Sequence, residues 1–184
     1  PNPASVLAFI ENHDTDRFLG EGNNLPMLKQ ASTLLLTTRR IPQLYYGTEV
    51  MMNGVKSKSD GYVRKDFPGG WTGDATNALT PAGRTKIQNE CYDFYKTILN
   101  WRKGNDVIAK GSMVQFMVQN GVYAYARQYE GKTIFVMLNG TDAETTVPLK
   151  FYKEILKNSK QGKDILSGKA ITFGEELKMG PRES

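Results

Sequence analysis

The sequence predicts an α/β segment followed by an all-β antiparallel sandwich. Two observations carry this prediction. Before about residue 104, short apolar runs alternate with a helical period, which is typical of βαβ units. After it, apolar residues recur at every second position, which is typical of antiparallel strands. We therefore predict one domain over residues 1–104 and a second over residues 105–184.

Two apolar runs flank a helix in the first segment. Residues 4–10 are continuously apolar, as in a parallel strand buried on both faces. Residues 25–40 have a helical period, with Pro26 in the first turn. Residues 41–50 form the second apolar run. Polar residues 11–17 follow the first strand directly, and the carboxyl end of a parallel strand is where α/β folds place their chemistry.

A long loop and a second helix complete this segment. Residues 53–80 have few periodic signals, and loops of this length are usually functional or mobile. Thr80 and Pro81 then predict a helix N-terminus. The helix is expected to end near Gly104, and its apolar face is formed by Ile87, Cys91, Phe94, Ile98 and Trp101.

The second segment begins with a predicted hairpin. Residues 112–119 and 122–129 alternate around Asn120–Gly121, a dipeptide that favours a tight hairpin turn. A further strand is predicted over residues 133–139. Shorter candidates follow at residues 144–149, 163–166, 170–173 and 177–179, and such regular spacing indicates an antiparallel sandwich.

Composition and charge exclude several functions. The formal charge is +5, but the lysines are scattered without a run of five like charges, so we expect no nucleic-acid partner. No apolar run approaches the roughly 18 residues of a spanning helix, so we expect no membrane partner. With one cysteine and one histidine, the chain excludes a zinc site. We also expect no metal ligand among its candidate site residues and no cofactor, while the metal requirement of a longer parent stays open.

The polar cluster after the first strand holds the one histidine, His13, beside Asp14. A carboxylate and an imidazole there can bind sugar hydroxyls, and the carboxylate can stabilise a developing oxocarbenium charge. From the spacing alone, a sugar-binding site and a solvated turn are equally supported interpretations of this cluster.

The segment FIENHDTDR, followed about 30 residues later by IPQLYYGTE, resembles the α-amylase family of glycoside hydrolases, family 13. The two motifs match the ends of the seventh and eighth barrel strands, and RKDFPGGW resembles a loop of the neopullulanase and cyclomaltodextrinase branch. The resemblance implies that residues 1–104 supply the last two βα units of a TIM (β/α)₈ barrel, ahead of the C-terminal sandwich. The length of 184 residues excludes a whole barrel, which takes roughly 200–250 residues.

The same resemblance implies roles for single residues. Asp14 matches the family's transition-state stabiliser, and His13 and Asn12 match its neighbours in the motif. The candidate substrate-binding residues are His13 and Asn12 from this motif, together with Arg64, Asp66 and Trp71 of the long loop, of which Arg64 and Asp66 are candidate rim contacts to oligosaccharide hydroxyls. The implied structural residues near the site are Arg17, Tyr46 and Glu49, and we favour Arg17 paired with a loop carboxylate. Trp71 either stacks on glucose or covers the loop's own small core.

The implied parent is a retaining hydrolase of α-glucosidic bonds in starch-derived oligosaccharides, pullulan or cyclodextrins. Retention needs two carboxyl groups about 5 Å apart, and no residue here corresponds to the nucleophilic aspartate or the acid/base glutamate. We therefore expect a portion of a longer enzyme, inactive alone. The alternative is a non-catalytic carbohydrate-binding or structural module.

Three further expectations follow. The apolar strands 4–10 and 41–46 should be covered by the remainder of the parent enzyme, by another copy or by rearranged loops. Arg40 stands where the family has a glycine before Ile41–Pro42, so the preceding helix must end differently. A periplasmic location is expected from the family's relatives that degrade imported starch fragments.

Overall fold

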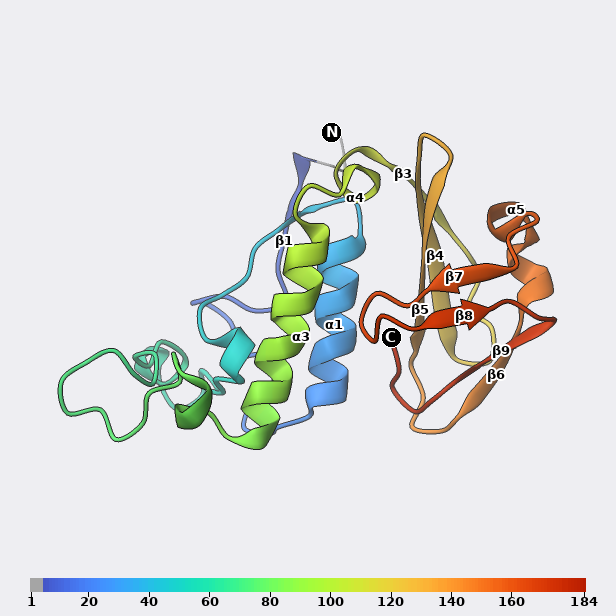
Figure 1. Cartoon of the computed structure of the whole chain (residues 1–184). Helices are drawn as coiled ribbons and strands as arrows, with labels where there is room; N and C mark the ends of the chain where they lie inside the picture. The colour runs from blue at the N-terminus through green and yellow to red at the C-terminus, as the bar shows by residue number, and fades with distance from the viewer. Residues whose placement is uncertain (1–4) are drawn as a thin grey trace. The chain divides into compact units, whose positions relative to one another are not determined.

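The computed structural model describes residues 5–184 and divides into two compact units (Figure 1). The first unit contains residues up to 35 and residues 40–96, and the second contains residues 36–39 and 97–184. The division at residue 104 stays a prediction. Among the helices of residues 5–184, none combines the length and apolar character needed to span a membrane.

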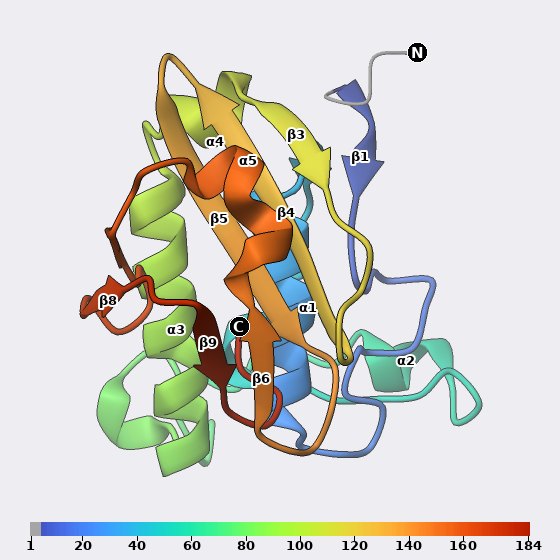
Figure 2. The ribbon, with the colours of Figure 1, turned by 90° about the vertical axis from the view of Figure 1, so that its right-hand side faces the viewer.

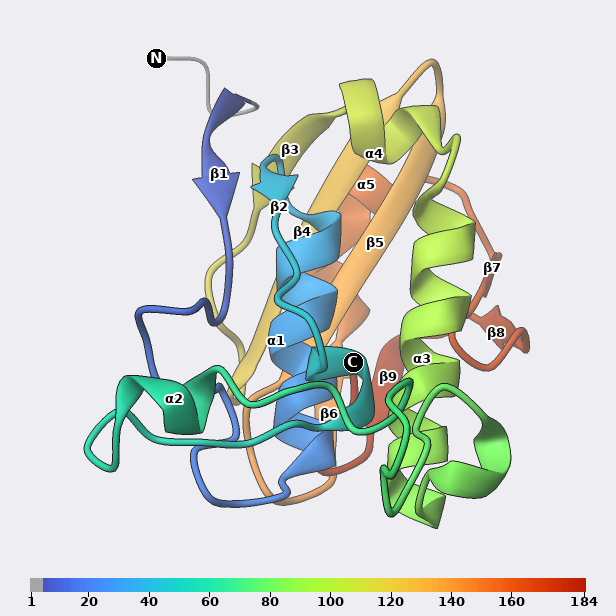
Figure 3. The ribbon, with the colours of Figure 1, turned by 90° about the vertical axis from the view of Figure 1, so that its left-hand side faces the viewer.

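The first unit begins with the order strand, helix, strand. Strand β1 (Leu7–Ala8) pairs in parallel with β2 (Ile41–Pro42), and α1 (Leu25–Thr37) connects them (Figure 3). Both strands are much shorter than the apolar runs of the sequence, and residue 4 lies outside the described residues. The prediction that the first strand is buried on both faces is wrong for this chain. Its side chains Val6, Leu7 and Phe9 are 42% to 52% exposed, because β2 is the one strand paired with β1 within residues 5–184.

Helix α3 (Lys86–Arg102) begins later than the sequence predicts. Pro81–Gly83 form a single 3₁₀ turn, η3, in place of the expected helix start. The amide of Thr85 donates to Gln88 Oε1 (2.9 Å), and the amide of Gln88 donates to Thr85 Oγ1 (3.4 Å). This reciprocal capping box satisfies two free amide donors at the helix start, so it determines the N-terminus.

Helix α1 packs beside α3 in the first unit. The Ser32 and Tyr95 hydroxyl groups form a buried hydrogen bond, and Lys29 Nζ lies 2.6 Å from Glu90 Oε1. Helix α1 ends at Thr37, three residues earlier than predicted. Between β2 and α3 lie η2 (Thr48–Val50) and α2 (Asp60–Val63), which the sequence pattern did not predict.

The second unit contains an antiparallel three-stranded sheet in the order β3–β4–β5. Its strands are β3 (Ser112–Gln115), β4 (Val122–Tyr129) and β5 (Lys132–Asn139), preceded by α4 (Asp106–Lys110). The predicted Asn120–Gly121 turn is confirmed. Both residues have positive φ, 50° and 77°, and Gln119 and Val122 exchange backbone hydrogen bonds. Strand β3 ends before this turn because the register shifts by one residue between Gln115 and Gln119, which is a β-bulge.

Further strand pairs complete the second unit (Figure 2). Strand β6 (Thr145–Pro148) pairs with β9 (Glu176–Met179), and β7 (Gln161–Lys163) pairs with β8 (Ala170–Thr172). The 3₁₀ turn η4 (Leu149–Tyr152) and α5 (Lys153–Leu156) follow β6. The predicted antiparallel C-terminal β domain is confirmed. Its core is lined by Val122, Ala124, Ala126, Met137, Val147, Leu149, Tyr152, Ile155, Leu156 and Met179.

One of the short predicted strands is displaced. The sequence predicts a strand over residues 163–166, but β7 ends at Lys163. The carboxylate of Asp164 accepts the backbone amides of Leu166 and Ser167, and this side-chain bonding turns the chain.

Candidate functional site

The turn after β1 presents His13 and Asp14 to solvent. The Asn12 side-chain oxygen accepts the Asp14 amide at 2.8 Å, and Thr15 Oγ1 accepts the Asn12 amide at 3.0 Å. The two side chains that this turn projects are 59% and 61% exposed, and His13 Nε2 lies 3.1 Å from Asp14 Oδ2. Asn12 therefore shapes the turn that carries the other two residues.

Arg64, just after α2, joins this turn from 50 residues away. Its Nη2 lies 3.1 Å from Asp14 Oδ1, and its Nε donates to the His13 carbonyl at 2.9 Å. The structure thus brings together Asn12, His13, Asp14 and Arg64, which we call the Asp14 cluster. Both carboxylate oxygens of Asp14 have a partner, one the guanidinium and the other the imidazole.

Two residues that sequence reasoning missed extend this cluster. Arg64 Nη2 also lies 3.1 Å from Asp60 Oδ2, and Lys56 Nζ lies 3.2 Å from Asp60 Oδ1. The hydrogen bond from Lys56, with the nearby charge of Arg64, lowers the pKa of the Asp60 carboxyl. In both pairs the opposite charges are four positions apart, a spacing that could have indicated them, although Asp60 is the one of the three residues that lies within α2.

A buried ion pair lies beside the exposed turn. Arg17 Nη1 is 3.3 Å from Glu11 Oε1, and both side chains are almost completely buried. Glu11 also accepts hydrogen bonds from the Thr48 hydroxyl and the Phe18 amide. The Glu11 carboxylate therefore has three partners, as a buried charge requires. The sequence placed Glu11 in the polar cluster without a role.

Arg17 connects the turn to two other segments. Its Nη1 donates to the Tyr46 carbonyl at 2.7 Å and its Nε to the Val63 carbonyl at 3.0 Å, while its guanidinium carbon lies 4.0 Å from the Tyr45 ring centroid. Arg17 Nη2 is buried without a hydrogen-bond partner within the described residues. One arginine thus fixes the turn, the segment after β2 and the end of α2 next to Arg64.

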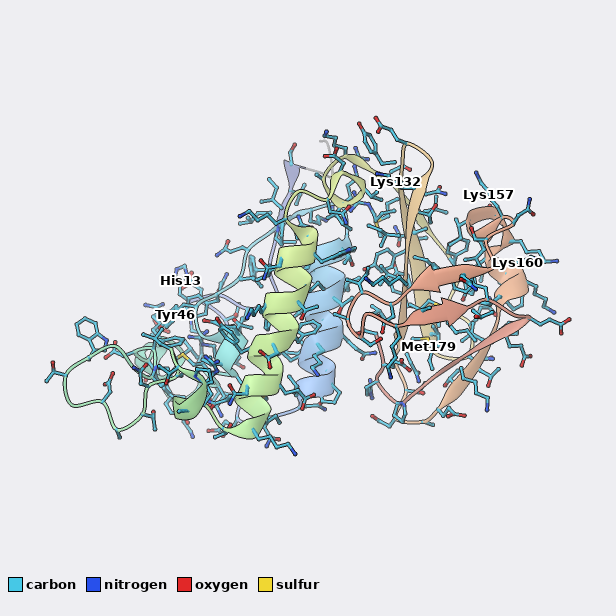
Figure 4. The ribbon with its side chains drawn as sticks, viewed as in Figure 1. His13, Tyr46, Lys132, Lys157, Lys160 and Met179 are labelled. Atoms are coloured by element: carbon cyan, nitrogen blue, oxygen red, sulfur yellow. The ribbon has the colours of Figure 1, made fainter. Side chains whose placement is uncertain are left out.

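Tyr46 and Glu49 follow β2. The Tyr46 hydroxyl donates to the Lys65 carbonyl at 2.7 Å, which connects this segment to the residue after Arg64. Glu49 is half-buried in the first turn of η2. Figure 4 shows His13 and Tyr46 on the same side of the first unit.

Asp66 and Trp71 lie apart from this network. Both are exposed, Trp71 to 71%, and the Trp71 amide donates to Asp74 Oδ2 at 2.9 Å. Within residues 5–184, no hydrogen bond or ion pair joins either side chain to the Asp14 cluster. Over the same residues, no group of three or more His, Cys, Asp or Glu side chains could hold a metal ion.

Known proteins resemble both units. The family described as the cyclo-malto-dextrinase C-terminal domain matches residues 113–184. An α-amylase of Niallia circulans is 31% identical over 91% of this chain and 29% of its own length. A cyclomaltodextrin glucanotransferase of Thermoanaerobacterium thermosulfurigenes is 31% identical over 96% of this chain and 22% of its own length.

A solved structure shares the fold. The crystal structure of an α-amylase from Geobacillus thermoleovorans, complexed with acarbose, matches 98% of this chain and 38% of its own chain. The TM-score is 0.74 and the sequence identity is 24%.

The chain is a relative of the α-amylase family and corresponds to the C-terminal part of such proteins. More particularly, its residues 113–184 match the C-terminal domain of the cyclo-malto-dextrinase type. The chain spans less than a third of the length of the two curated relatives described above.

Proposed function

We propose that this chain is the C-terminal portion of a retaining hydrolase of α-glucosidic bonds in starch-derived oligosaccharides, pullulan or cyclodextrins. Residues 1–104 would supply the last two βα units of its TIM barrel, and residues 105–184 its sandwich domain. The observation that carries the proposal is the Asp14 cluster, in which Arg64 contacts the turn that follows the parallel strand β1. The names of the relatives, α-amylase and cyclomaltodextrin glucanotransferase, support the same class of chemistry.

Asp14 has the chemistry of a transition-state stabiliser in this proposal. An ionised carboxylate offers about four acceptor sites, and in this structure two donors engage it. A sugar hydroxyl can therefore bind Asp14 without displacing Arg64 or His13. The fixed negative charge then stabilises the positive charge that develops on the sugar ring during cleavage.

The residues around Asp14 bind the sugar and orient the Asp14 carboxylate. His13 contacts the same sugar through its exposed imidazole, and Arg64 holds one Asp14 oxygen in a fixed direction. Asn12 acts through the turn that it caps. Asp66 and Trp71 would contact more distant sugars of an oligosaccharide, the indole by stacking on a sugar face. Tyr46, Glu49 and Arg17 support the segments beneath.

The reaction also needs a nucleophile and an acid/base, two carboxyl groups about 5 Å apart. In the proposed enzyme these come from strands outside the 184 residues. The 184-residue chain alone is therefore expected to show no hydrolysis of maltooligosaccharides. Hydrolysis by the purified chain that Asp14→Ala abolishes would contradict this.

The proposal is tested with the gene product that carries this chain. We expect it to hydrolyse a maltooligosaccharide, and Asp14→Asn to lower kcat by about 10²–10³-fold or more, the loss typical of a removed transition-state contact. Asp142→Asn, an exposed carboxylate of the second unit, is the matched control and should leave kcat unchanged. An Asp14→Asn protein that keeps half of its activity would refute the role of Asp14. A gene product that binds the oligosaccharide without cleaving it would favour the non-catalytic module.

A further inference from the structure

A cleft of about 320 Å³ opens in the second unit, remote in sequence from the Asp14 cluster. Its walls come from the β4–β5 hairpin and from α5 with the residues that follow it. They include Tyr129, Glu130, Lys132, Ile155, Lys157 and Ser159. The volume is at the lower end of the roughly 300–1,000 Å³ of small-molecule sites, so the cleft suits a ligand of monosaccharide size.

Lysine ammonium groups without partners gather at this cleft. Lys132 and Lys157 line it and Lys160 follows Ser159 closely; all three are exposed. Figure 4 shows Lys132 near the β4–β5 turn and Lys157 and Lys160 near α5. Within residues 5–184 none of the three forms an ion pair, a property that they share with Lys150 and Lys169 of the same unit, so it is their position at the cleft that distinguishes them. Their charges remain available for an anion from outside the chain.

The remaining lining is suited to hydroxyl groups. Glu130 supplies a carboxylate that accepts hydrogen bonds, and Ser159 supplies a hydroxyl that can donate or accept. Tyr129 is half-buried and supplies an aromatic ring. Ile155, 5% exposed, closes the floor of the cleft. Such a set binds a polyhydroxylated ring, while the lysines bind a group of two negative charges.

Two lining residues hold unusual backbone conformations. Glu130 has φ 48° and Lys157 has φ 49°, in the left-handed region that non-glycine residues rarely adopt. The first central position of such a hairpin turn usually holds Asn, Asp or Gly. Strained residues of this kind cluster at functional sites, and these two line the same cleft.

From the cleft, its unpaired ammonium groups and its hydroxyl-binding lining, we propose that the second unit binds a sugar phosphate. The phosphate lies between the ammonium groups of Lys132 and Lys157, because a phosphate monoester carries nearly two negative charges at neutral pH. The sugar lies against Tyr129, with its hydroxyl groups bound by Glu130 and Ser159. This site uses none of the residues of the Asp14 cluster and does not depend on the function proposed for that cluster.

The test titrates glucose 6-phosphate into the 184-residue chain by isothermal calorimetry at low salt, with inorganic phosphate and maltose as comparison probes. We expect saturable binding of glucose 6-phosphate, weaker binding of inorganic phosphate and none of maltose at this cleft. The double variant Lys132→Gln/Lys157→Gln should weaken glucose 6-phosphate binding by about tenfold or more, the loss of two charge-assisted contacts. The matched control Lys150→Gln/Lys169→Gln removes the same charge from exposed lysines outside the cleft lining and should change the affinity less than twofold.

The variant Glu130→Gly distinguishes the contribution of the sugar to binding from that of the phosphate. It removes the carboxylate and suits the positive φ of the turn, so it should fold at least as stably as the parent. We expect it to weaken glucose 6-phosphate binding but not inorganic phosphate binding. Absence of saturable glucose 6-phosphate binding, or equal weakening by the control pair, would overturn the site. Inorganic phosphate that binds as tightly as glucose 6-phosphate would overturn the assignment of the sugar.

Discussion

Removing Arg17 tests how much the buried ion pair beside the candidate site contributes to the stability of the first unit. Arg17→Met keeps a long apolar side chain but deletes every donor of the guanidinium. The Glu11 carboxylate then stays buried with two of its three partners, the Thr48 hydroxyl and the Phe18 amide. Breaking a buried pair from one side destabilises a protein by about 3–5 kcal/mol. The surviving partners favour the lower part of this range.

A double variant, Arg17→Met with Glu11→Gln, shows how much of the destabilisation comes from the unpaired charge of Glu11. With Glu11→Gln added, the buried group is neutral. The remaining cost is that of the two hydrogen bonds that Arg17 no longer donates to the Tyr46 and Val63 carbonyls, about 2 kcal/mol in total. We therefore expect the double variant to be more stable than Arg17→Met alone by about 1–2 kcal/mol, a coupling within the range of contacting residues.

The assay is urea unfolding followed by circular dichroism. Arg84→Met provides the matched control, because Arg84 is a buried arginine of the same unit whose hydrogen bonds go to the neutral groups of Asn89 and Ala78. Glu11→Gln should rescue the Arg17 variant and should not rescue the Arg84 variant. A double variant that is less stable than Arg17→Met would refute the assignment of a buried, charge-balanced pair.

Two further predictions concern other buried groups. Arg127 is fully buried and donates to four carbonyl groups, those of Thr37, Ile108, Gly111 and Ser112, so Arg127→Met should destabilise the second unit by about 3–5 kcal/mol. Arg182→Met, at a surface pair, should leave the urea midpoint unchanged, and equal midpoints for the two variants would count against this explanation. Burial raises the pKa of the Cys91 thiol to about 12. Iodoacetamide at pH 9 should therefore label Cys91 slowly in the native chain and rapidly in urea, as mass spectrometry would show; fast native labelling would contradict the burial.

Local chemistry explains which parts of the fold the sequence predicted. The Asn120–Gly121 turn depends on the φ preferences of those two residues, so it could be recognised without knowing the rest of the molecule. The start of α3 depends on a competition between two local signals. Thr80–Pro81 forms one 3₁₀ turn, whereas the side chains of Thr85 and Gln88 complete a reciprocal cap.

Long-range contacts explain what the sequence could not predict. Arg17 meets the Tyr46 carbonyl across 29 positions and the Val63 carbonyl across 46, and no local pattern specifies such backbone acceptors. Burial of β1 also depends on neighbours. An apolar strand is buried when strands flank it on both sides in a sheet. In this chain β1 pairs with β2, and the side chains around β1 are exposed. The Asp14 motif could be recognised, but its contact with Arg64 depends on how residues 53–66 fold back.

The burial of these groups separates their roles. Asp14 is 61% exposed and Arg17 is buried, although they are only three positions apart in the sequence. A change at Asp14 removes a charge that water already solvates, so it should alter chemistry with little effect on stability. A change at Arg17 leaves the Asp14 carboxylate intact but releases the Tyr46 and Val63 carbonyls that position Arg64 and the turn. If the Asp14 cluster acts on sugars as proposed, the two changes therefore differ in unfolding free energy: Arg17→Met lowers it, whereas Asp14→Asn lowers kcat and leaves the unfolding free energy nearly unchanged.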